Sequence, residues 1–568
     1  GSVTRTPMAA SSNIAELKFD EKVRSDSDQD LDQQPTLAHE DDRHAHRLPF
    51  KRFLHYAAIQ RSFEVNDKYD ELYHTQEKQL ADQHSNLSPD KLESHRKLRV
   101  VNFYMVFFLI TTDILGPNNA PYAISQIGYA PGVILYVALG VFAFICGCLL
   151  QKLFCKLDSN NYPIRTYADL AARLLGRWFR YLIAALHFVQ LLLNVGAICL
   201  TSGQALAQII KASAQDPKLC FTVCILIWAI VGMVLGQIRS LRTFSVIANL
   251  AVWMNITVCI ITMVGVAKYP PNYRIAKATY GINPNEPIRH SAVTPQLQSD
   301  QTILSQRLSG LNQMVFAWGG ATVFCEILAE MKRPHEFWKG LLGADMLIMV
   351  VYLLFGVFVY SYQGQYTYAT ANMGISNYNL QTASNVLNLI TGIFGGVLYG
   401  NVGLKVLYQG VLVPELRFPK LTTKFGAAAW TAMVVVYWSV AYIIGTAIPI
   451  INDLVSLIGC VCTINFSYTF PFLFYFAYLF RTDAGKHDVY DPDSGLVQRY
   501  DSWRSFSRWK RALFPSLGGF VLRLASLSLF LGSLSLSALG LYAAVKSIIQ
   551  DTSTSLAKAF SCTPNTDG

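Results

Sequence analysis

Long apolar stretches separated by short polar gaps constrain this chain more than any other feature of its sequence. Between residues 99 and 550, about eleven stretches approach the ~20 residues that a helix needs to cross a bilayer. These stretches are 101–127, 131–151, 181–210, 219–238, 244–267, 311–331, 341–362, 383–412, 426–448, 450–480 and 518–549. Because the backbone groups of a segment in lipid must pair with one another, the stretches predict transmembrane α-helices and an all-α integral membrane protein.

The composition agrees with lipid as the solvent and excludes several other classes. Only 15% of the 568 residues are charged, whereas soluble domains carry about 25% charged residues. Most of the 11 cysteines lie inside the apolar stretches and none form a CxxC pair, so neither a disulfide scaffold nor a zinc site is predicted. The sequence has no Walker loop, HExxH helix or nucleophile elbow, so we expect a protein that is not an enzyme and uses no cofactor.

Lysine and arginine gather in alternate gaps between the stretches. The gaps after the second, fourth, sixth, eighth and tenth stretches are rich in them, whereas residues 128–130 and 363–382 contain none. Because basic residues mark the cytosolic side of a membrane protein, the N-terminus is predicted to lie inside and the C-terminus outside. The net charge of +10 is thereby explained by topology, and we expect no nucleic-acid partner.

This topology divides the chain into three parts. We expect a cytosolic and largely disordered region over residues 1–98, a transmembrane domain over 99–550 and an extracellular tail over 551–568. Cys220 and Cys562 would both face outside and could pair, which their spacing alone cannot decide.

Two of the stretches are interrupted by residues that break helices. The first contains Gly116-Pro117 followed by Pro121, and the sixth contains FAWGGAT at residues 316–322. A break is tolerated at membrane depth only where the freed backbone faces protein or a water-filled cavity. Breaks at corresponding places in two halves indicate an inverted five-plus-five repeat with a transport site at mid-depth, and the eleventh helix is then an addition. The alternative is that both breaks are ordinary packing kinks.

The residues around both breaks resemble a known family. The motifs that carry the resemblance are TTDILGP at 111–117, Pro121, GYAPG at 128–132, FAWGG at 316–320, Phe324 and EILAEM at 326–331. They resemble fungal members of the amino acid/auxin permease family, which belongs to the amino acid–polyamine–organocation superfamily with the LeuT-like fold. The resemblance covers residues 98–550 and implies eleven spans, a cytosolic N-terminus and proton-coupled amino acid uptake. Ala321 stands where many relatives have histidine, and Cys325 where many have proline.

The breaks predict where a substrate would bind. Free amides at 116–119, at the start of the second half-helix, suit a carboxylate, and carbonyls released at 318–320 suit an ammonium group. The predicted substrate contacts around the breaks are Gly116, Asn118, Asn119, Tyr122, Phe316, Trp318, Gly319 and Gly320. The alternatives are that the asparagines only satisfy unwound backbone and that the aromatic residues only pack.

A polar face on the third stretch adds to this site. His187, Gln190, Asn194 and Thr201 are spaced by three, four and seven residues, which places them on one side of a helix. Such a face in lipid must point to protein or a cavity. We expect Asn194 to contact substrate and His187 to relay a proton, although interhelical hydrogen bonds alone would also explain the pattern.

Five further polar residues are predicted to serve proton coupling, ion coupling or gating. Asp113 and Glu326 lie beside the two breaks, Asn401 and Lys405 share a face of the eighth stretch, and Asp453 begins the tenth. Each has a simpler alternative. Asp113 could cap the half-helix after the break, Glu326 could pair with a basic loop residue, Lys405 could reach the cytosol, and Asp453 could be solvated.

These observations predict a secondary active transporter for neutral amino acids, driven by protons and working by alternating access. The absence of a strong central charge from the inferred pocket favours neutral substrates. The expected partners are an amino acid, protons and the lipid bilayer, and the expected location is the plasma membrane rather than the vacuolar membrane. The alternatives are an amino acid sensor on a transporter fold, an exchanger or vacuolar transporter, and a channel. The sequence leaves open the amino acid, the proton stoichiometry and the oligomeric state.

Overall fold

The computed structural model describes most of the chain beyond residue 48. The described residues are 49–64, 101–114, 116–159, 162–213, 219–238, 242–280, 282–284, 286–290, 300–412, 418–419, 423–448, 450–492, 496–553, 560 and 562. Residues 50–568 form one unit of contacts, which we call the helical body, and residues 1–49 form another. The fold of the helical body is described below.

Within the described residues, eight helices are long and apolar enough to cross a membrane. They are α8 (Tyr129–Leu157), α10 (Arg177–Ser213), α12 (Arg242–Lys268), α16 (Phe337–Gln363), α17 (Tyr378–Leu407), α19 (Lys424–Ala447), the continuous helix of α20 (Ile451–Ile458), η9 (Gly459–Thr463), η10 (Asn465–Thr469) and α21 (Phe470–Ala484), and α23 (Leu517–Ser553). The apolar helix α11 (Phe221–Leu235) is shorter. The predicted all-α membrane architecture is therefore confirmed, while the number of eleven spans stays a prediction.

The first and sixth stretches are split as their sequences predict. The first forms α6 (Phe103–Ile114), the short turn η3 (Pro117–Asn119) and α7 (Ala120–Ile127). The sixth forms α14 (Asp300–Phe316), the turn η4 (Gly319–Val323) and α15 (Phe324–Glu330). Pro117 has no amide hydrogen to donate to the preceding turn, which ends α6 before the chain restarts in α7.

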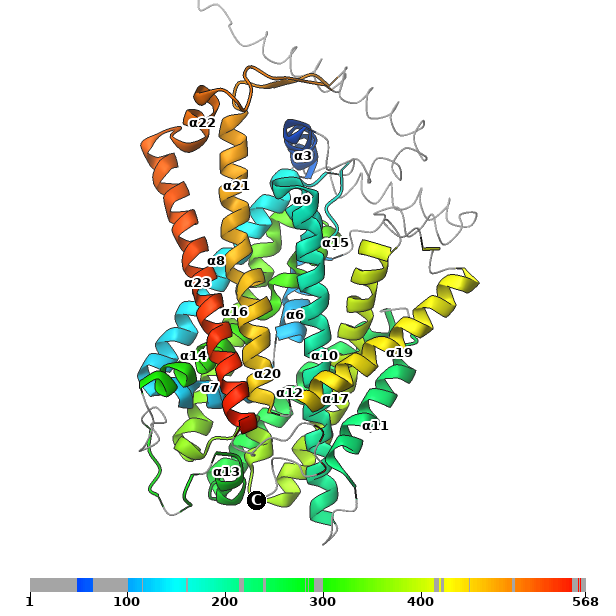
Figure 1. Ribbon diagram of the computed structural model, residues 1–568, viewed down its shortest axis with the longest axis vertical. Helices are drawn as coiled ribbons and strands as arrows, with labels where there is room; N and C mark the ends of the chain where they lie inside the picture. The colour runs from blue at the N-terminus through cyan, green and yellow to red at the C-terminus, as the bar shows by residue number, and fades with distance from the viewer. Residues whose placement is uncertain are drawn as a thin grey trace, which may run out of the picture. The chain divides into compact units, whose positions relative to one another are not determined.

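Shorter elements connect these helices. They are α3 (Phe50–Glu64), α9 (Tyr167–Leu175), α13 (Tyr273–Tyr280), η5 (Pro334–Glu336), η6 (Gly364–Tyr366), η7 (Ala371–Gly374), η8 (Tyr408–Leu412), α22 (Phe506–Leu513) and the antiparallel strands β1 (Val489–Tyr490) and β2 (Val497–Gln498). Helix α3 and the end of α23 lie at opposite ends of the helical body (Figure 1). This arrangement agrees with a chain that crosses the membrane an odd number of times.

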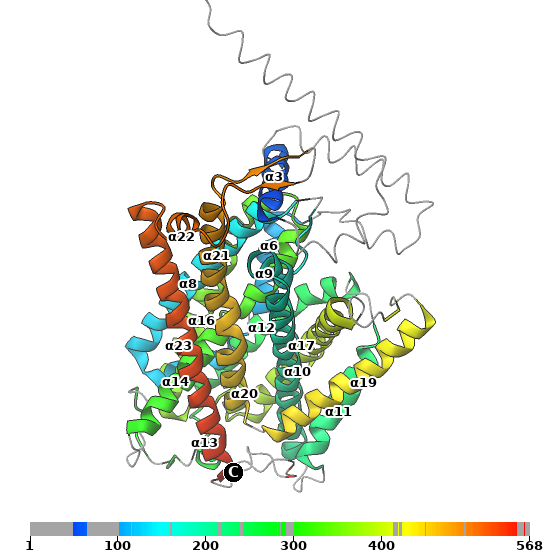
Figure 2. The same cartoon turned by 45° about the horizontal axis from the view of Figure 1, so that its top comes forward.

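Helices α10 and α17 lie side by side at the centre of the body and pack against α19, α11 and α12 (Figures 1 and 2). Their shared core includes Leu200, Val434 and Leu454, all fully buried. Close packing depends on small residues here, because a Cβ atom added at Gly232 of α11 would lie 2.2 Å from the Trp438 ring of α19. Glycine at this position therefore allows α11 and α19 to approach.

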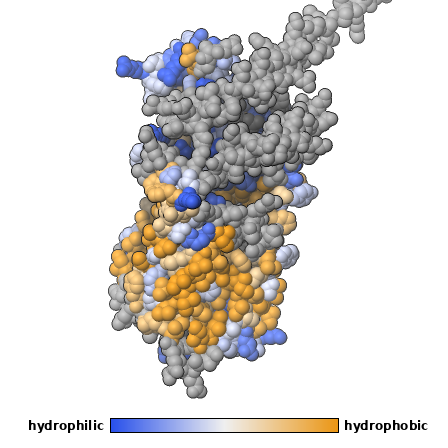
Figure 3. Space-filling view, turned by 90° about the vertical axis from the view of Figure 1, so that its right-hand side faces the viewer, coloured by the Kyte–Doolittle hydropathy of each residue, from blue (hydrophilic) through white to orange (hydrophobic). Residues whose placement is uncertain are grey.

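One face of the helical body shows a broad apolar surface (Figure 3). It lies over α11 and α19, where exposed side chains include Ile230 and Val234 of α11 and Val436 and Ile443 of α19. An exposed apolar surface of this extent is expected where a protein faces acyl chains rather than water.

Helix α3 packs onto one end of α8 and the loop that follows it. Phe53 is 2% exposed and its ring meets Tyr162 edge-on, while the Arg173 guanidinium lies 4.8 Å from the Phe53 ring centre. Arg61 donates to the Cys155 carbonyl and pairs with the buried Asp158 carboxylate, with both contacts at 3.1 Å. A segment that the sequence assigned to a disordered tail thus contains a docked helix.

Replacing Arg61 by alanine should weaken the docking of α3. The change removes hydrogen bonds to the Cys155 and Asp158 carbonyls and the ion pair with Asp158, which together contribute about 1.5–3 kcal/mol to docking. Amides of residues 50–64 should therefore exchange with deuterium about tenfold or more faster, measured by mass spectrometry. Ser62→Ala is the matched control, because the exposed Ser62 hydroxyl bonds only within its own helix, to Ile59, among the contacts described. Equal exchange rates in the two variants would contradict the docking described here.

A disulfide joins Cys220, just before α11, to Cys562 beyond α23. The backbone supports the same contact, because the Phe221 amide donates to the Cys562 carbonyl at 3.0 Å and the Phe560 amide donates to Thr446 at 3.3 Å. The sequence left this pairing open, and the structure shows that the two cysteines are bonded.

A membrane-impermeant maleimide should label this pair only after reduction. In intact cells, the wild-type protein should stay unlabelled until a reductant is added, because the other nine described cysteines are free but buried or half-buried. Cys220→Ser should instead be labelled at Cys562 without reduction. The double variant Cys220→Ser/Cys562→Ser should remain unlabelled throughout. Labelling of the unreduced wild type would contradict the pairing.

Candidate functional site

A cavity of about 360 Å³ lies where the two interrupted helices face α10, α12, α16, α17 and the α20–η9 segment. Its volume falls within the ~300–1,000 Å³ that is typical of small-molecule sites. The polar residues that line it are Asn118, Asn119, Gln190, Asn194, Thr201, Ser202, Asn255, Thr322, Tyr352, Thr370, Asn388, Thr391, Tyr399 and Thr463. Among the described residues, its lining contains no charged side chain.

The first break contributes backbone and amide groups to this cavity. Gly116, Asn118 and Asn119 line it, as the sequence predicts. The Asn118 Oδ1 is buried and has no hydrogen-bond partner within the described ranges. The Gly116 amide, expected to be free, donates to the Tyr352 hydroxyl at 3.1 Å. A substrate carboxylate would therefore meet amides after Gly116 or displace this hydroxyl. Tyr122, on α7, is absent from the lining.

At the second break, only some of the predicted residues line the cavity. Phe316 and Gly319 line it together with Thr322. Trp318 does not, because its ring packs against α8, where a Cβ added at Gly140 would lie 2.5 Å from it. Gly320 is buried outside the lining.

The polar face of α10 points into the cavity as its spacing predicts. Gln190, Asn194 and Thr201 line it, whereas His187 is buried outside the lining and its ring centre lies 5.7 Å from that of Phe466. Gln190 Oε1 and Asn194 Oδ1 are buried without a hydrogen-bond partner in the described part of the chain. Unsatisfied buried acceptors beside a cavity are groups that a ligand can satisfy.

Three lining residues carry no clear sequence signal. Thr463 lies in η9, and its buried Oγ1 has no partner among the described residues. Tyr352 lies in the middle of apolar α16, and Thr370 belongs to the loop between α16 and α17. The one sequence signal for such a residue is a hydroxyl group inside an apolar helix, and this signal does not predict which face of the helix lines a cavity.

The loop between α16 and α17 covers one end of the cavity. Thr370 and Met373 of this loop line it, and Met373 is 1% exposed. The loop is tied down through Asn372, which donates to Asn385 of α17 at 3.0 Å, while Asn385 donates to Gln208 of α10 at 2.9 Å. The cavity is thus lined on one side by a loop that hydrogen bonds connect to α17 and α10.

Among the predicted coupling residues whose side chains are described, none lines the cavity. Asp113 is in the last turn of α6, and Asn119 precedes α7, so the interpretation of Asp113 as a cap for the second half-helix is wrong. The Asp113 side chain lies outside the described residues. Asp453 is 3% exposed, so the solvated interpretation of this residue is also wrong.

The remaining predicted residues are spread over three helices. Asn401 is 1% exposed and donates to the Ile238 carbonyl at 2.6 Å, and Lys405 is half-buried one turn further along α17. Glu326 is half-buried, and its Oε2 has no hydrogen-bond partner within the described residues. In the described ranges, no three His, Cys, Asp or Glu side chains gather as a metal site requires.

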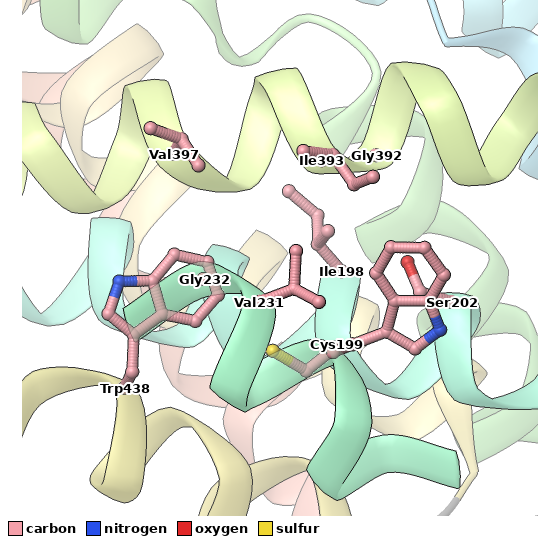
Figure 4. A pocket seen from close by; sticks show the side chains of 10 residues that line it. Ile198, Cys199, Ser202, Val231, Gly232, Gly392, Ile393, Val397 and Trp438 are labelled. Atoms are coloured by element: carbon pink, nitrogen blue, oxygen red, sulfur yellow. The ribbon is translucent and has the colours of Figure 1, made fainter. Parts of the chain in front are cut away.

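A second, much smaller pocket lies beside the cavity, between α10, α11, α17 and α19 (Figure 4). Ile198, Ser202 and Gly392 line both spaces, while Trp438 closes the far end of the small one. With a volume of about 10 Å³ and mainly apolar walls, it is too small for an amino acid.

Comparison with known proteins supports a transport site. Residues 100–492 match the family model for transmembrane amino acid transporter protein, which is more than half of the chain. The chain belongs to this family. Its similarity to amino acid/auxin permeases, predicted from the motifs at the two breaks, is therefore confirmed.

Three relatives illustrate the range of this transmembrane amino acid transporter family. The N amino acid transport system protein of Neurospora crassa is 22% identical over 404 residues, covering 70% of this chain and 80% of the relative. A transmembrane transporter of Gibberella moniliformis is 25% identical over 64% of this chain and 71% of its own length. Lysine histidine transporter-like 3 of Arabidopsis thaliana is 22% identical over 55% of this chain and 64% of its own length.

Proposed function

We propose that this protein is a secondary active transporter that carries neutral amino acids together with protons by alternating access. The observation that carries the proposal is the cavity between the two interrupted helices, with its uncharged lining and its unsatisfied buried acceptors. Membership of a family of amino acid transporters, rather than of enzymes, supports amino acids as the substrate class.

The proposed binding mode follows from the charges of a zwitterion. The carboxylate is held by amides around Asn118 and Asn119, where the restarting helix presents its positive end. The ammonium group donates to Gln190 Oε1, Asn194 Oδ1 and the carbonyls released at the second break. Because the described lining has no charged residue, a charged substrate side chain would lack a counter-ion, which supports neutral substrates.

Coupling and gating are assigned to residues outside the cavity. We retain Asp113, His187 and Glu326 as candidate proton-carrying groups, and Asn401, Lys405 and Asp453 as candidate ion-coupling or gating residues. Alternating access would then require the loop that contains Thr370 to open on the outer side. The expected setting is the plasma membrane, with residues 1–98 in the cytosol and residues 551–568 outside.

The decisive experiment measures uptake of radiolabelled amino acids into proteoliposomes under an imposed pH gradient. A transporter that moves one proton per substrate should reach about tenfold accumulation for a gradient of one pH unit, since that gradient stores about 1.4 kcal/mol. A protonophore should abolish the accumulation, and neutral amino acids should compete while lysine and glutamate should not. Saturable binding without accumulation would indicate a sensor, a requirement for internal substrate would indicate an exchanger, and unsaturable flux would indicate a channel.

A further inference from the structure

Helix α16 contains a buried carboxylate that the proposed binding mode does not use. Asp345 is 6% exposed, and it lies one helical turn from both Leu341 and Met349. Leu341 and Met349 both face α8, because Cβ atoms added at Gly147 and Gly140 would lie 2.5 Å and 2.8 Å from them. Asp345 therefore faces α8 between these two glycines.

Among the described residues, this carboxylate has no partner to balance its charge. Asp345 Oδ2 is buried, and the described residues offer it neither a hydrogen bond nor a cation within ion-pair distance. Lys339, the basic residue on the same helix, pairs with Glu336 at 2.8 Å and lies 5.6 Å from the Phe103 ring centre. An ionised carboxylate without a partner is costly at membrane depth, whereas a protonated one is neutral and can donate a hydrogen bond.

Few titratable groups face Asp345 from the neighbouring elements. The Cys148 thiol of α8 and the Tyr468 hydroxyl of η10 lie within electrostatic reach, and Tyr468 donates to the Leu139 carbonyl at 3.1 Å. Of the other elements packed on α16, α7 carries Tyr122, α12 carries Cys259, η5 carries His335 and Glu336, and η6 carries Tyr366. Tyr136 of α8 meets Tyr352 instead. On α6, the exposed Tyr104 is described, whereas the Asp113 side chain is not. Among the described groups of the elements packed on α16, Asp345 therefore has no cation or second carboxyl group as a close neighbour.

The position of Asp345 connects it to the second break. At Gly140 of α8, the Trp318 ring packs next to Met349. At Gly147 of α8, the Phe324 ring packs next to Leu341, 3.1 Å from the position that a Cβ atom would take. Residues on both sides of η4 thus cover the segment of α8 that Asp345 faces. Any movement of the second break relative to α8 must change the surroundings of this carboxylate.

We propose that Asp345 is a further proton-carrying residue, beside the candidates Asp113, His187 and Glu326, and that it binds and releases the transported proton as the second break moves. In this step the carboxylate takes up one proton from the outer solution to become a neutral carboxylic acid, and it later returns that proton to the cytosol. No other bond forms or breaks. The inference rests on the proposed proton coupling and places it on a residue that lines no part of the substrate cavity.

The test compares Asp345→Asn with wild type in proteoliposomes by two assays. The first is accumulation driven by a pH gradient, and the second is counterflow, in which unlabelled internal substrate exchanges for labelled external substrate without a gradient. The counterflow rate of Asp345→Asn should stay within about threefold of wild type. Its gradient-driven accumulation should be at least about tenfold lower than that of wild type, because the amide cannot carry a proton. Its uptake should also no longer depend on pH between 5 and 8.

The control is Glu336→Gln, a change to the acidic residue of η5 that directly precedes the same helix, which should keep both activities. Gradient-driven accumulation by Asp345→Asn at the wild-type level, or equal loss of both activities in a monodisperse sample, would overturn the inference. If Asp345→Asn does not fold, Asp345→Glu is the second variant, because it keeps a carboxyl group. It should accumulate substrate, with a shifted midpoint in the pH dependence of uptake. An unchanged midpoint would overturn the inference. Failure of the wild type to accumulate would instead refute the proposed proton coupling itself.

Discussion

Asn194→Leu should reduce the catalytic efficiency of uptake, kcat/KM, by tenfold or more. Asn194 lines the cavity from α10, and its buried Oδ1 has no hydrogen-bond partner in the described part of the chain. If the substrate ammonium group supplies that partner, its loss removes one hydrogen bond to a charged group, about 1.5–3 kcal/mol of binding. Leucine has the same branching at Cγ but is bulkier than asparagine and cannot accept a hydrogen bond. Initial uptake rates over a range of substrate concentrations measure the effect.

Thr201→Val is the matched control for this prediction. Thr201 lies on the same face of α10 and lines the same cavity, but its hydroxyl already donates to the Ala197 carbonyl at 3.0 Å. We expect its kcat/KM to stay within about twofold of wild type, since no bond to substrate is lost. A loss in Thr201→Val as large as in Asn194→Leu would show that the polar face acts through packing rather than through substrate contact.

Arg508→Leu should destabilise the segment between α21 and α23 by about 3 kcal/mol or more. The Arg508 guanidinium pairs with Asp488 at 2.6 Å and with Asp501 at 3.2 Å, and the side chains of Arg508 and Asp488 are 6% and 5% exposed. Removing the cation leaves the Asp488 carboxylate buried without its partner, which costs more than the pair itself contributes. Residues 485–513 should become sensitive to limited proteolysis, and their amides should exchange at least about a hundredfold faster.

Two further variants separate the ion pair from a general effect of substitution. Arg504→Leu changes an exposed arginine in the same segment and should shift stability by no more than about 0.5 kcal/mol. Asp488→Asn combined with Arg508→Leu should recover most of the protection, because the unpaired charge is gone. A double variant as labile as Arg508→Leu alone would contradict the explanation.

The parts of the fold that the sequence predicts are those set by single residues with strong local effects. Pro117 and the glycines at 319 and 320 weaken the helix locally, so both breaks could be placed within a few residues. The cavity-facing side of α10 could also be predicted, because the spacing of Gln190, Asn194 and Thr201 matches the period of a helix.

The parts that could not be predicted depend on side-chain direction and on contacts distant in sequence. Trp318 was expected in the pocket, but the backbone at the break, with φ −107° and ψ 28°, directs its ring to α8. Thr463 faces the cavity from η9, a segment of π-helix, and the periodicity of the sequence does not predict this wider turn. Asp345 lies in an apolar run, and only its charge sets it apart.

The disulfide between Cys220 and Cys562 also has a consequence for biosynthesis. Because Cys562 follows α23, the bond cannot close until the ribosome has made every helix from α11 onward. Throughout that interval Cys220 carries a reactive thiol at the start of α11. A chain that stops before Cys562, or whose helix α23 fails to insert, keeps this thiol, so oxidation of Cys220 marks a molecule whose synthesis has passed Cys562.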